Sequence, residues 1–213
     1  MKKIIFILTV VITAAAATAQ LQPIKLNAPD LNRGLPVMQA FKERHSERAY
    51  ADKPLSLQDL SDLLWAATGV NRPDGHLTAP TALNKRDIDV YALTAEGAYR
   101  YDAQSHTLVP VEGSEGDHRA LIRGFQTDFQ LPPVTLIMVT TPSRFGVDDA
   151  KAAMIMGAAD AGIVSENISL FCAGNGLVTV PRASMNQAEL RELLRLPDNA
   201  YLILNNPVGY PVK

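Results

Sequence analysis

The most constraining feature of the sequence is a long apolar helix, predicted to run from Asp148 or Asp149 to about Ala173. Alanine, methionine, isoleucine, valine and leucine occupy positions nearly all round its axis. A helix with this pattern has to be buried on most of its sides. Gly157 and Gly162 allow a neighbouring element to approach its backbone closely. The composition suits the seam of a dimer as well as the core of a single chain.

Shorter periodic segments lie before and after this helix. Further helices are predicted over residues 36–42, from a Ser56 cap to Ala67, over 117–126, and from Ser184 or Asn186 to Arg195. Strands are predicted over residues 88–94, 98–102, 107–111, 134–141, 177–181 and 201–205. Because strands and helices mix without strict alternation, the pattern favours an α+β fold over a doubly wound sheet.

The N-terminus has the pattern of a cleavable signal peptide over residues 1–19. Lys2-Lys3 precedes the apolar run Ile4–Ala17, and Ala17-Thr18-Ala19 has the small residues that signal peptidase requires. The alternative is a retained membrane anchor, which is disfavoured because the run is short for a bilayer span. We therefore predict a periplasmic or secreted protein that leaves the membrane after cleavage.

The rest of the chain is long enough for one domain with a core of its own. Residues 20–35 contain Pro23, Pro29 and Gly34 and are predicted to form an extended lead-in to a single domain over 36–213. Removing the two signal-peptide lysines leaves 18 basic residues against 22 acidic ones, a net charge of −4. This balance gives no indication of nucleic-acid binding.

Several classes of site are disfavoured by what the sequence contains. A lone Cys172 in an apolar helical run forms no internal disulfide and is predicted to be a buried, unreactive thiol. The histidines show no metal-ligand spacing, so no metal site is predicted; they are His45, His76, His106 and His118. No Gly-x-Ser-x-Gly elbow is present, which argues against a serine hydrolase.

The segment Arg44-His45-Ser46-Glu47-Arg48 is the first candidate for ligand binding. A planar guanidinium forms paired hydrogen bonds with phosphate oxygens, and a serine hydroxyl adds a short donor. Two arginines and a serine within five residues therefore suit a single phosphate. Taken alone, the segment fits a solvated charged stretch better than a phosphate site.

Two loops are further candidates. Pro80-Thr81-Ala82-Leu83-Asn84 is a rigid turn that ends in a side-chain amide, which can read the polar edge of a flat heterocycle. The alternative is a plain turn before a strand. The segment Gly174–Ala183 passes from a helix stop into a strand, and its backbone amides can face a ring system. Ordinary helix capping explains its glycines equally well.

Taken together, the order and spacing of these segments resemble the nitroreductase superfamily. That family typically opens with an Arg-x-Ser-x-Arg segment, which Arg44, Ser46 and Arg48 match. A Pro-Ser-x-x-Asn turn follows, and residues 80–84 are similar, with threonine in place of serine.

The resemblance continues to the end of the chain. A long apolar helix with a Gly-Leu-x-Thr ending is matched by Asp160-Ala161-Gly162 through Pro181, and Pro207-Val208-Gly209-Tyr210-Pro211 is similar to the family's closing segment. The resemblance covers about residues 38–211. A weaker similarity, in residues 98–102, points to the branch that contains azoline-oxidising dehydrogenases of the SagB type.

The resemblance implies a mixed, largely antiparallel central sheet flanked by helices, with the long buried helix at a dimer interface. It implies flavin mononucleotide (FMN) as cofactor, shared between two subunits. The residues implied for the phosphate, the ribityl chain and the pyrimidine edge are Arg44, His45, Ser46 and Arg48. Those implied to approach the flavin from the partner subunit are Thr81, Ala82 and Asn84. Those implied to line the ring are Pro181, Arg182 and Ala183.

The resulting hypothesis is an exported FMN-dependent oxidoreductase that transfers hydride or electrons between a reductant and a small organic acceptor such as a nitro, quinone or azoline compound. The alternatives are a non-catalytic flavin-binding or carrier protein, and a binding domain without cofactor. No acid or base is assigned; Tyr50, His76 and Arg182 are candidates. Because export removes the chain from NAD(P)H pools and no Gly-rich dinucleotide fingerprint is present, we expect another electron donor.

Two features depart from the family pattern. Many members continue well beyond the closing segment and supply a basic residue to the phosphate, whereas only Val212 and Lys213 follow Pro211 here. Either Lys213 reaches the phosphate or the two arginines of the 44–48 segment hold it alone. Arg86 stands where glutamine is common, on the expected substrate side.

Overall fold

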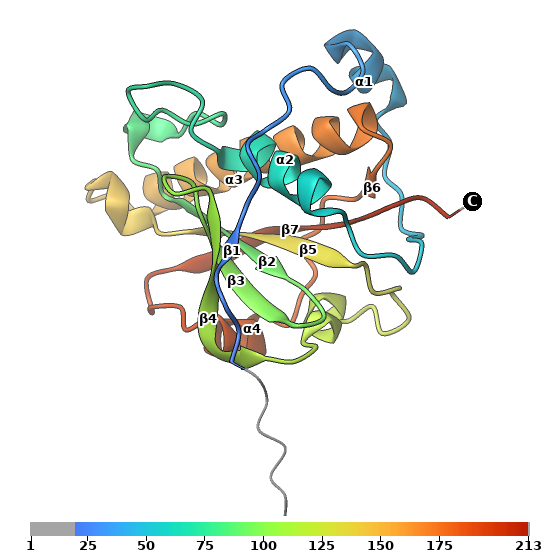
Figure 1. Cartoon of the computed structure of the whole chain (residues 1–213). Helices are drawn as coiled ribbons and strands as arrows, with labels where there is room; N and C mark the ends of the chain where they lie inside the picture. The colour runs from blue at the N-terminus through green and yellow to red at the C-terminus, as the bar shows by residue number, and fades with distance from the viewer. Residues whose placement is uncertain (1–19, 213) are drawn as a thin grey trace, which may run out of the picture.

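A single antiparallel sheet organises the chain in a computed structural model that describes residues 20–212 (Figure 1). The predicted signal peptide, residues 1–19, and Lys213 lie outside the described residues. The strands are β1 (Ile24–Lys25), β2 (Ile88–Leu93), β3 (Gly97–Asp102), β4 (Thr107–Glu115), β5 (Val134–Thr140), β6 (Val178–Thr179) and β7 (Tyr201–Gly209). Their order is β1-β4-β3-β2-β5-β7-β6, and all the strand pairs between them are antiparallel. The predicted α+β class and largely antiparallel sheet are confirmed.

Helices cover both faces of this sheet (Figure 1). The α-helices are α1 (Val37–Glu43), α2 (Leu57–Thr68), α3 (Ala150–Gly174) and α4 (Gln187–Leu193), and the 3₁₀ helices are η1 (Ala82–Asn84), η2 (Arg119–Arg123) and η3 (Pro142–Phe145). Ser56 caps α2 by accepting the N–H of Asp59 at 3.0 Å, as its sequence pattern predicts. Asp149 caps α3 through the N–H groups of its first turn. None of the helices described between residues 20 and 212 is long and apolar enough to cross a membrane.

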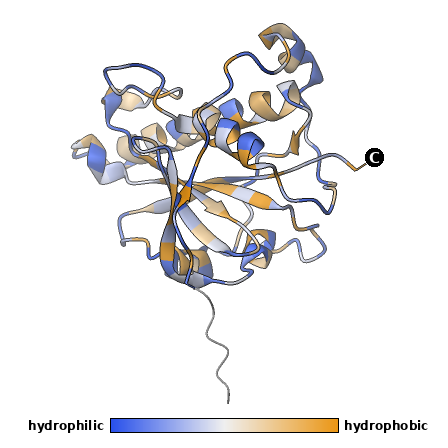
Figure 2. Cartoon of the chain, viewed as in Figure 1, coloured by the Kyte–Doolittle hydropathy of each residue, from blue (hydrophilic) through white to orange (hydrophobic). Residues whose placement is uncertain are grey.

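Successive side chains along the central strands point to opposite faces of the sheet, and the apolar ones form a core on each side. On β5, Leu136 and Met138 face the core under α2 and α3, whereas Ile137 and Val139 face the core that α4 and η2 cover. This explains why β5 reads as a continuous apolar run, and Figure 2 shows apolar residues along the central strands. Each fully buried aliphatic side chain contributes about 1.5–3 kcal/mol to folding.

Helix α3 approaches the sheet most closely at Gly157. A Cβ atom on that residue would lie 2.3 Å from Oγ1 of Thr140, at the end of β5. The glycine therefore lets α3 settle onto the strand, and the predicted role of Gly157 in close approach is confirmed. Cys172, further along α3, is 1% exposed, and burial raises the pKa of its thiol. The predicted buried thiol is confirmed.

The lead-in over residues 20–35 crosses α2 and is fastened by charged groups. The Arg33 guanidinium binds the carboxylates of Asp59 and Asp62 at 2.6 and 2.8 Å. Its Nε donates to the Asn175 side chain at 2.8 Å, beyond the end of α3. The Asp59 carboxylate has a lowered pKa because hydrogen bonds, first from Tyr210 and also from Ser56 and Arg33, outweigh its burial.

Some sequence-based boundaries are wrong. The helix predicted over 117–126 is only the five-residue η2, because Gly124 ends it at positive φ. The strand predicted over 107–111 continues to Glu115, and the one predicted over 201–205 continues to Gly209. Proline lacks the amide hydrogen of a strand ladder, yet Pro207 lies within β7 opposite Thr135. Pairing with β3 decides the end of β4, and pairing with β5 and β6 decides the end of β7; the local sequence does not show these pairings.

One side of α3 remains exposed in the single chain, although its composition predicts burial on most sides. Ile155 is 59% exposed, Ile163 is 38% exposed, and Ala159 lies between them at helical spacing. Short α1 packs against α3 and adds exposed Met38 and Phe41. We call these five residues the α1–α3 apolar face. The predicted dimer seam would account for this exposure, and it stays a prediction.

Candidate functional site

The sequence-predicted site residues fall into two groups, one near the C-terminal end of α3 and the other beside its N-terminal half (Figure 1). The first group contains the 44–48 segment and residues 181–183, near the C-terminal end of the helix. The second is the turn around η1, which is attached to α3 at Asp160. Fourteen residues separate Asp160 from Gly174 at the C-terminal end of α3, so the two groups are on the order of 20 Å apart along the helix. One chain does not bring them together.

The 44–48 segment runs in extended form from the end of α1 past β6. The N–H of Glu47 donates to the carbonyl of Thr179 at 3.0 Å, which fixes the segment beside the last strand. The Glu47 carboxylate accepts the N–H groups of Arg48 and Ala49 at 2.6 and 3.0 Å. These bonds lower the pKa of Glu47, so its charge is directed at its own backbone.

The two arginines of this segment meet no carboxylate in the part of the chain that the structure describes. Within residues 20–212, neither Arg44 nor Arg48 forms an ion pair. Ser46 and Arg48 are exposed and Arg44 is half-buried. This donor set fits a dianionic phosphate, which would otherwise have to compete with a carboxylate for the guanidinium groups.

Two cavities flank the segment and give a ligand room. One of about 340 Å³ touches His45 and is also lined by Leu177 and Val178. Another of about 360 Å³ touches Arg48 and is lined by the loop at residues 126–130. Volumes of this size are typical of small-molecule sites.

Residues 181–183 alternate between exposed and buried positions after β6. Pro181 and Ala183 are exposed, whereas Arg182 is 8% exposed. The Arg182 backbone pairs with Asn205 through two hydrogen bonds of 2.8 and 2.7 Å. Pro181 and Ala183 therefore present their surfaces beside the 44–48 segment, while Arg182 faces the protein interior.

The Arg182 side chain is held by packing and hydrogen bonds within the protein. Its guanidinium carbon lies 3.8 Å from the centre of the Phe129 ring, and its N–H groups donate to the carbonyl of Ile122 at 3.1 Å and to the Gln126 side chain at 2.6 Å. Burial lowers its pKa. The side chain thus ties the loop after η2 to the end of β6, and its position disfavours a role as acid or base.

The turn around η1 has a strained backbone. Leu83 and Asn84 both have φ of 53°, and Arg86 has φ of 48°. Such values are uncommon for residues other than glycine, cost about 1–3 kcal/mol each, and cluster at functional sites. The Thr81 hydroxyl accepts the N–H of Arg86 at 2.9 Å and holds the end of the turn.

A buried carboxyl pair supports this turn from beneath. Oδ2 of Asp160 on α3 accepts the N–H of Ala82 at 2.7 Å, and Oδ2 of Asp87 accepts the hydroxyl of Thr140 at 2.6 Å. Oδ1 of Asp87 meets no donor among the described residues. Burial, together with the neighbouring Asp160 carboxylate, raises the pKa of Asp87 to about 6. Protonated Asp87 can donate a hydrogen bond to the Asp160 carboxylate.

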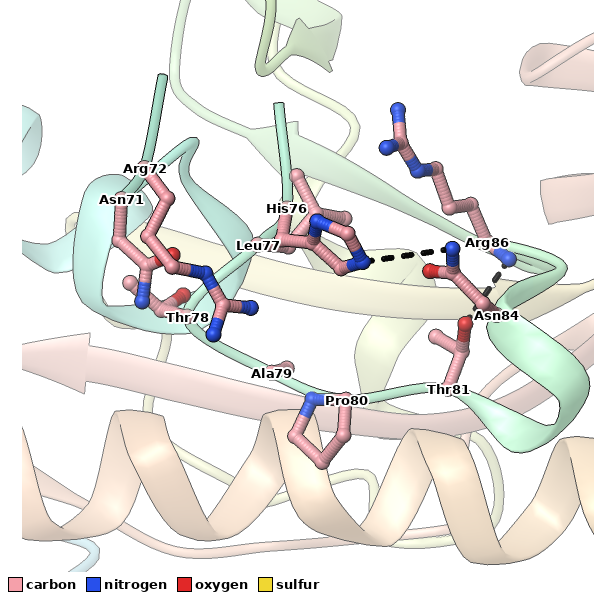
Figure 3. Close-up of a pocket in the computed structure, with 10 residues that line it drawn as sticks. All are labelled: Asn71, Arg72, His76, Leu77, Thr78, Ala79, Pro80, Thr81, Asn84 and Arg86. Carbon is pink, nitrogen blue, oxygen red and sulfur yellow. Dashed lines mark hydrogen bonds between the residues drawn. The ribbon is translucent and has the colours of Figure 1, made fainter. Parts of the chain in front are cut away.

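A cavity of about 370 Å³ opens between this turn and the loop at residues 71–77 (Figure 3). Arg72 and His76 project from the loop, and Asn84 and Arg86 project from the turn. The Asn84 amide lies 3.5 Å from Nε2 of His76. Arg72 and the Asp87–Asp160 pair were not among the predicted site residues. The acid at position 160, in an otherwise apolar stretch of helix, is the sequence signal that indicates the pair.

Tyr50, one of the acid or base candidates, is buried, and the ring of His106 is held by contacts within the protein. Tyr50 is 1% exposed, and burial raises the pKa of its hydroxyl. His106 lies in the β3–β4 turn, where its ring contacts Tyr101 and the carbonyl of Asn27. Among residues 20–212, no three His, Cys, Asp or Glu side chains are grouped to hold a metal ion.

The profile of the nitroreductase family matches residues 41–210, which include both groups of site residues. The chain belongs to the nitroreductase family. A protein of Methanocaldococcus jannaschii described as a putative nitroreductase is 26% identical over 196 residues, which are 89% of this chain and 98% of the relative.

Solved structures agree with this membership. A crystal structure from Ralstonia eutropha JMP134, described in the same words, has a TM-score of 0.81 and 35% identity and covers 90% of each chain. The NADPH:FMN oxidoreductase of Vibrio harveyi, complexed with NAD⁺, has a TM-score of 0.59 and 17% identity over 83% of this chain and 69% of its own. This second likeness shows the fold alone. The predicted family is confirmed, and the chain has an oxidoreductase fold.

Proposed function

We propose that this protein is an exported FMN-dependent oxidoreductase that works as a homodimer and reduces or oxidises a small organic compound of the nitro, quinone or azoline kind. Family membership supports the reaction class. The observation that supports FMN as the cofactor is the pair of guanidinium groups in the 44–48 segment, which are free of carboxylates within the described chain. Bound FMN would supply the hydride and electron transfer, and the protein supplies binding and orientation.

Arg44, Ser46 and Arg48, with His45 beside them, would hold the phosphate and the ribityl chain. Because the Glu47 carboxylate is occupied by backbone N–H groups, it leaves the two arginines available to an anion. A positive group near the pyrimidine edge of the ring stabilises negative charge there. Arg44 or Arg48 would provide it.

Pro181 and Ala183 would line the ring, since both are exposed beside the 44–48 segment. The N–H of Arg182 is already donated to Asn205. We therefore assign the backbone amide that approaches the ring to Ala183. The Arg182 side chain, packed on Phe129, would support this loop from the protein side.

A second copy of the chain would complete the site. The turn with Thr81, Ala82 and Asn84 is attached to α3 at Asp160, on the order of 20 Å along the helix from its C-terminal end. We infer that it does not reach a flavin held by the 44–48 segment of the same chain. Two copies related by a two-fold axis and packed through the α1–α3 apolar face would bring each turn to the other copy's phosphate segment. The exposed face supports this arrangement, because apolar patches on a surface mark interaction sites.

Absorption spectroscopy of the mature chain, expressed from Gln20, tests the cofactor. We expect yellow protein with bound FMN, and Arg44→Ala and Arg48→Ala should each weaken FMN retention about tenfold or more, because each removes a charge-assisted hydrogen bond. Arg100→Gln, an exposed arginine of β3, is the control and should retain FMN. Unchanged retention in Arg44→Ala would refute the phosphate role.

An anaerobic screen of reductants and acceptors tests the reaction. Reduction of bound flavin by one donor and its reoxidation by a nitro, quinone or azoline compound is the expected result. Yellow protein that no donor reduces would indicate a flavin carrier. Colourless protein that ignores added FMN would indicate a binding domain without cofactor. The azoline-oxidising branch stays a prediction, since the comparisons reach the family and not the branch.

A further inference from the structure

The cavity in Figure 3 collects positive charge. Arg72 and Arg86 both line it, with the His76 ring between them. The loop's carboxylate, Asp74, lies 2.8 Å from Nδ1 of His76 and 3.9 Å from Nε of Arg72, and it accepts the N–H of His76. Asp74 is thus engaged mainly by His76, and within the described chain Arg86 forms no ion pair.

The backbone on both sides of the cavity has a defined conformation. Arg86 follows the strained turn, and its N–H is bound to Thr81. Its terminal nitrogen lies 3.8 Å from where a Cβ atom of Gly75 would stand, so it reaches across towards the opposite loop. On that loop, Asn71 donates its N–H to the carbonyl of His76 at 3.0 Å, which closes a tight hairpin. Strain of this kind persists where it serves a site.

We propose that this cavity is the acceptor-binding site and that it takes a small organic anion, held through its carboxylate or an equivalent group by Arg72 and Arg86. Planar guanidinium groups form paired hydrogen bonds with such groups. A volume of about 370 Å³ suits one small organic molecule. His76 and Asn84 offer further polar contacts at the cavity wall. In a chain of negative net charge, this cavity concentrates anions locally.

This inference rests on the proposed function, because the turn has to meet the flavin of a second copy. It names the acceptor class for that site. With a nitro acceptor, the step is a two-electron reduction in which the nitro group takes two electrons and two protons from reduced enzyme. It becomes a nitroso group, and its lost oxygen leaves as water.

A matched pair of acceptors separates charge from shape. 4-Nitrobenzoate and 4-nitrobenzamide differ little in size, and only the first is an anion. FMN-loaded enzyme, reduced by light with deazaflavin and EDTA, would be mixed anaerobically with each acceptor and its reoxidation followed by absorbance. Calorimetry with oxidised enzyme would give the Kd of each compound without turnover.

The variants are Arg72→Gln and Arg86→Gln, with Arg100→Gln as control. Each cavity variant should raise the Kd for 4-nitrobenzoate about tenfold and leave that for 4-nitrobenzamide unchanged, as expected for loss of one charged hydrogen-bond donor. Added salt should reduce the wild-type preference for the anion. Equal effects on both compounds, or no effect on either, would overturn the inference.

Two outcomes distinguish this inference from the proposed function. If neither acceptor reoxidises the enzyme but 4-nitrobenzoate binds with the expected dependence on Arg72 and Arg86, the anion site stands and the proposed nitro chemistry fails. If Arg86→Gln instead loses FMN, the cavity serves the cofactor phosphate and the inference is wrong.

Discussion

When Asp87 is protonated, it can share its proton with the Asp160 carboxylate beneath the strained turn, and this gives stability a defined dependence on pH. In an unfolded chain the pKa of an aspartate lies near 4. In the folded protein the pKa of Asp87 is raised to about 6, so folding favours its protonated form. The stabilisation from the pair is therefore complete below about pH 4 and is lost as pH rises through about 6.

Substitution of Asp87 by asparagine should remove this dependence. An asparagine amide can accept the Thr140 hydroxyl and donate to the Asp160 carboxylate, as protonated Asp87 does. We expect the Tm of Asp87→Asn, relative to wild type, to be higher at pH 8 than at pH 5. Thermal unfolding at the two pH values measures this. A difference from wild type that is the same at both would show that Asp87 does not carry the shared proton.

Tyr210 shows how one hydroxyl secures the closing segment of the chain. Its O–H donates to the Asp59 carboxylate, and its oxygen accepts the N–H of Ser56 at 3.2 Å, at the start of α2. Tyr210→Phe should lower the free energy of unfolding by about 1–2 kcal/mol, because a hydrogen bond to a charged group is lost. Denaturant titration measures the change. Tyr201→Phe, at a 44% exposed position, is the control and should have no effect.

At the scale of elements, the fit between α3 and β5 depends on the absence of one side chain. Alanine in place of glycine within a helix ordinarily adds about 0.5–1 kcal/mol of stability. At Gly157 we expect the opposite sign, a loss of about 1–3 kcal/mol, because the new Cβ would overlap Thr140.

The matched control for this substitution is Gly174→Ala, at the last turn of the same helix. Its Cβ would meet Ala40 at 3.6 Å, an ordinary contact. Chemical denaturation should show this variant at or above wild-type stability. A Gly157→Ala protein as stable as Gly174→Ala would mean that α3 can move away from β5 at little cost.

The same elements show what the sequence can and cannot predict. The spacing of apolar residues and the capping residues predicted α2 and α3 closely, because Ser56 and an aspartate at 148 or 149 are local signals that act within one turn. The ends of β4 and β7 were missed, because distant strands decide them. Strand β1 was missed for the same reason, since its two residues pair with β4 about 80 positions away.

The site residues also divide into those that a local sequence signal indicates and those that only the fold reveals. The arginines at 44 and 48 were predicted from residue type and spacing, and the structure leaves both free of carboxylates within its described range. Arg182 was expected to line the ring together with Pro181 and Ala183, and this stays a prediction. Its side chain packs on Phe129, because successive residues after β6 point in opposite directions and Arg182 points inward. Arg72 carries no local signal, and only the fold places it opposite Arg86.

At the scale of the molecule, the separation of the two site groups makes cofactor binding and assembly one problem. A single chain offers a phosphate segment near the C-terminal end of α3 and a strained turn beside the N-terminal half of that helix. A ligand that binds only the assembled form stabilises that form by mass action. Under the proposed arrangement, FMN should raise the Tm of the protein and shift the monomer–dimer equilibrium towards dimer together.

Ile155, which lies on α3 in the α1–α3 apolar face, provides the test of that linkage. Because it is 59% exposed in the single chain, Ile155→Lys should leave each subunit folded, as far-ultraviolet circular dichroism would show. In a dimer seam it would bury an unpaired charge and weaken association about 100-fold or more. Sedimentation should then show monomer, and FMN retention should fall with it although no phosphate contact has changed. Tyr201→Lys, at a 44% exposed position at the start of β7, should remain dimeric and yellow. A monomeric Ile155→Lys protein that keeps its flavin would show that one chain suffices for the cofactor.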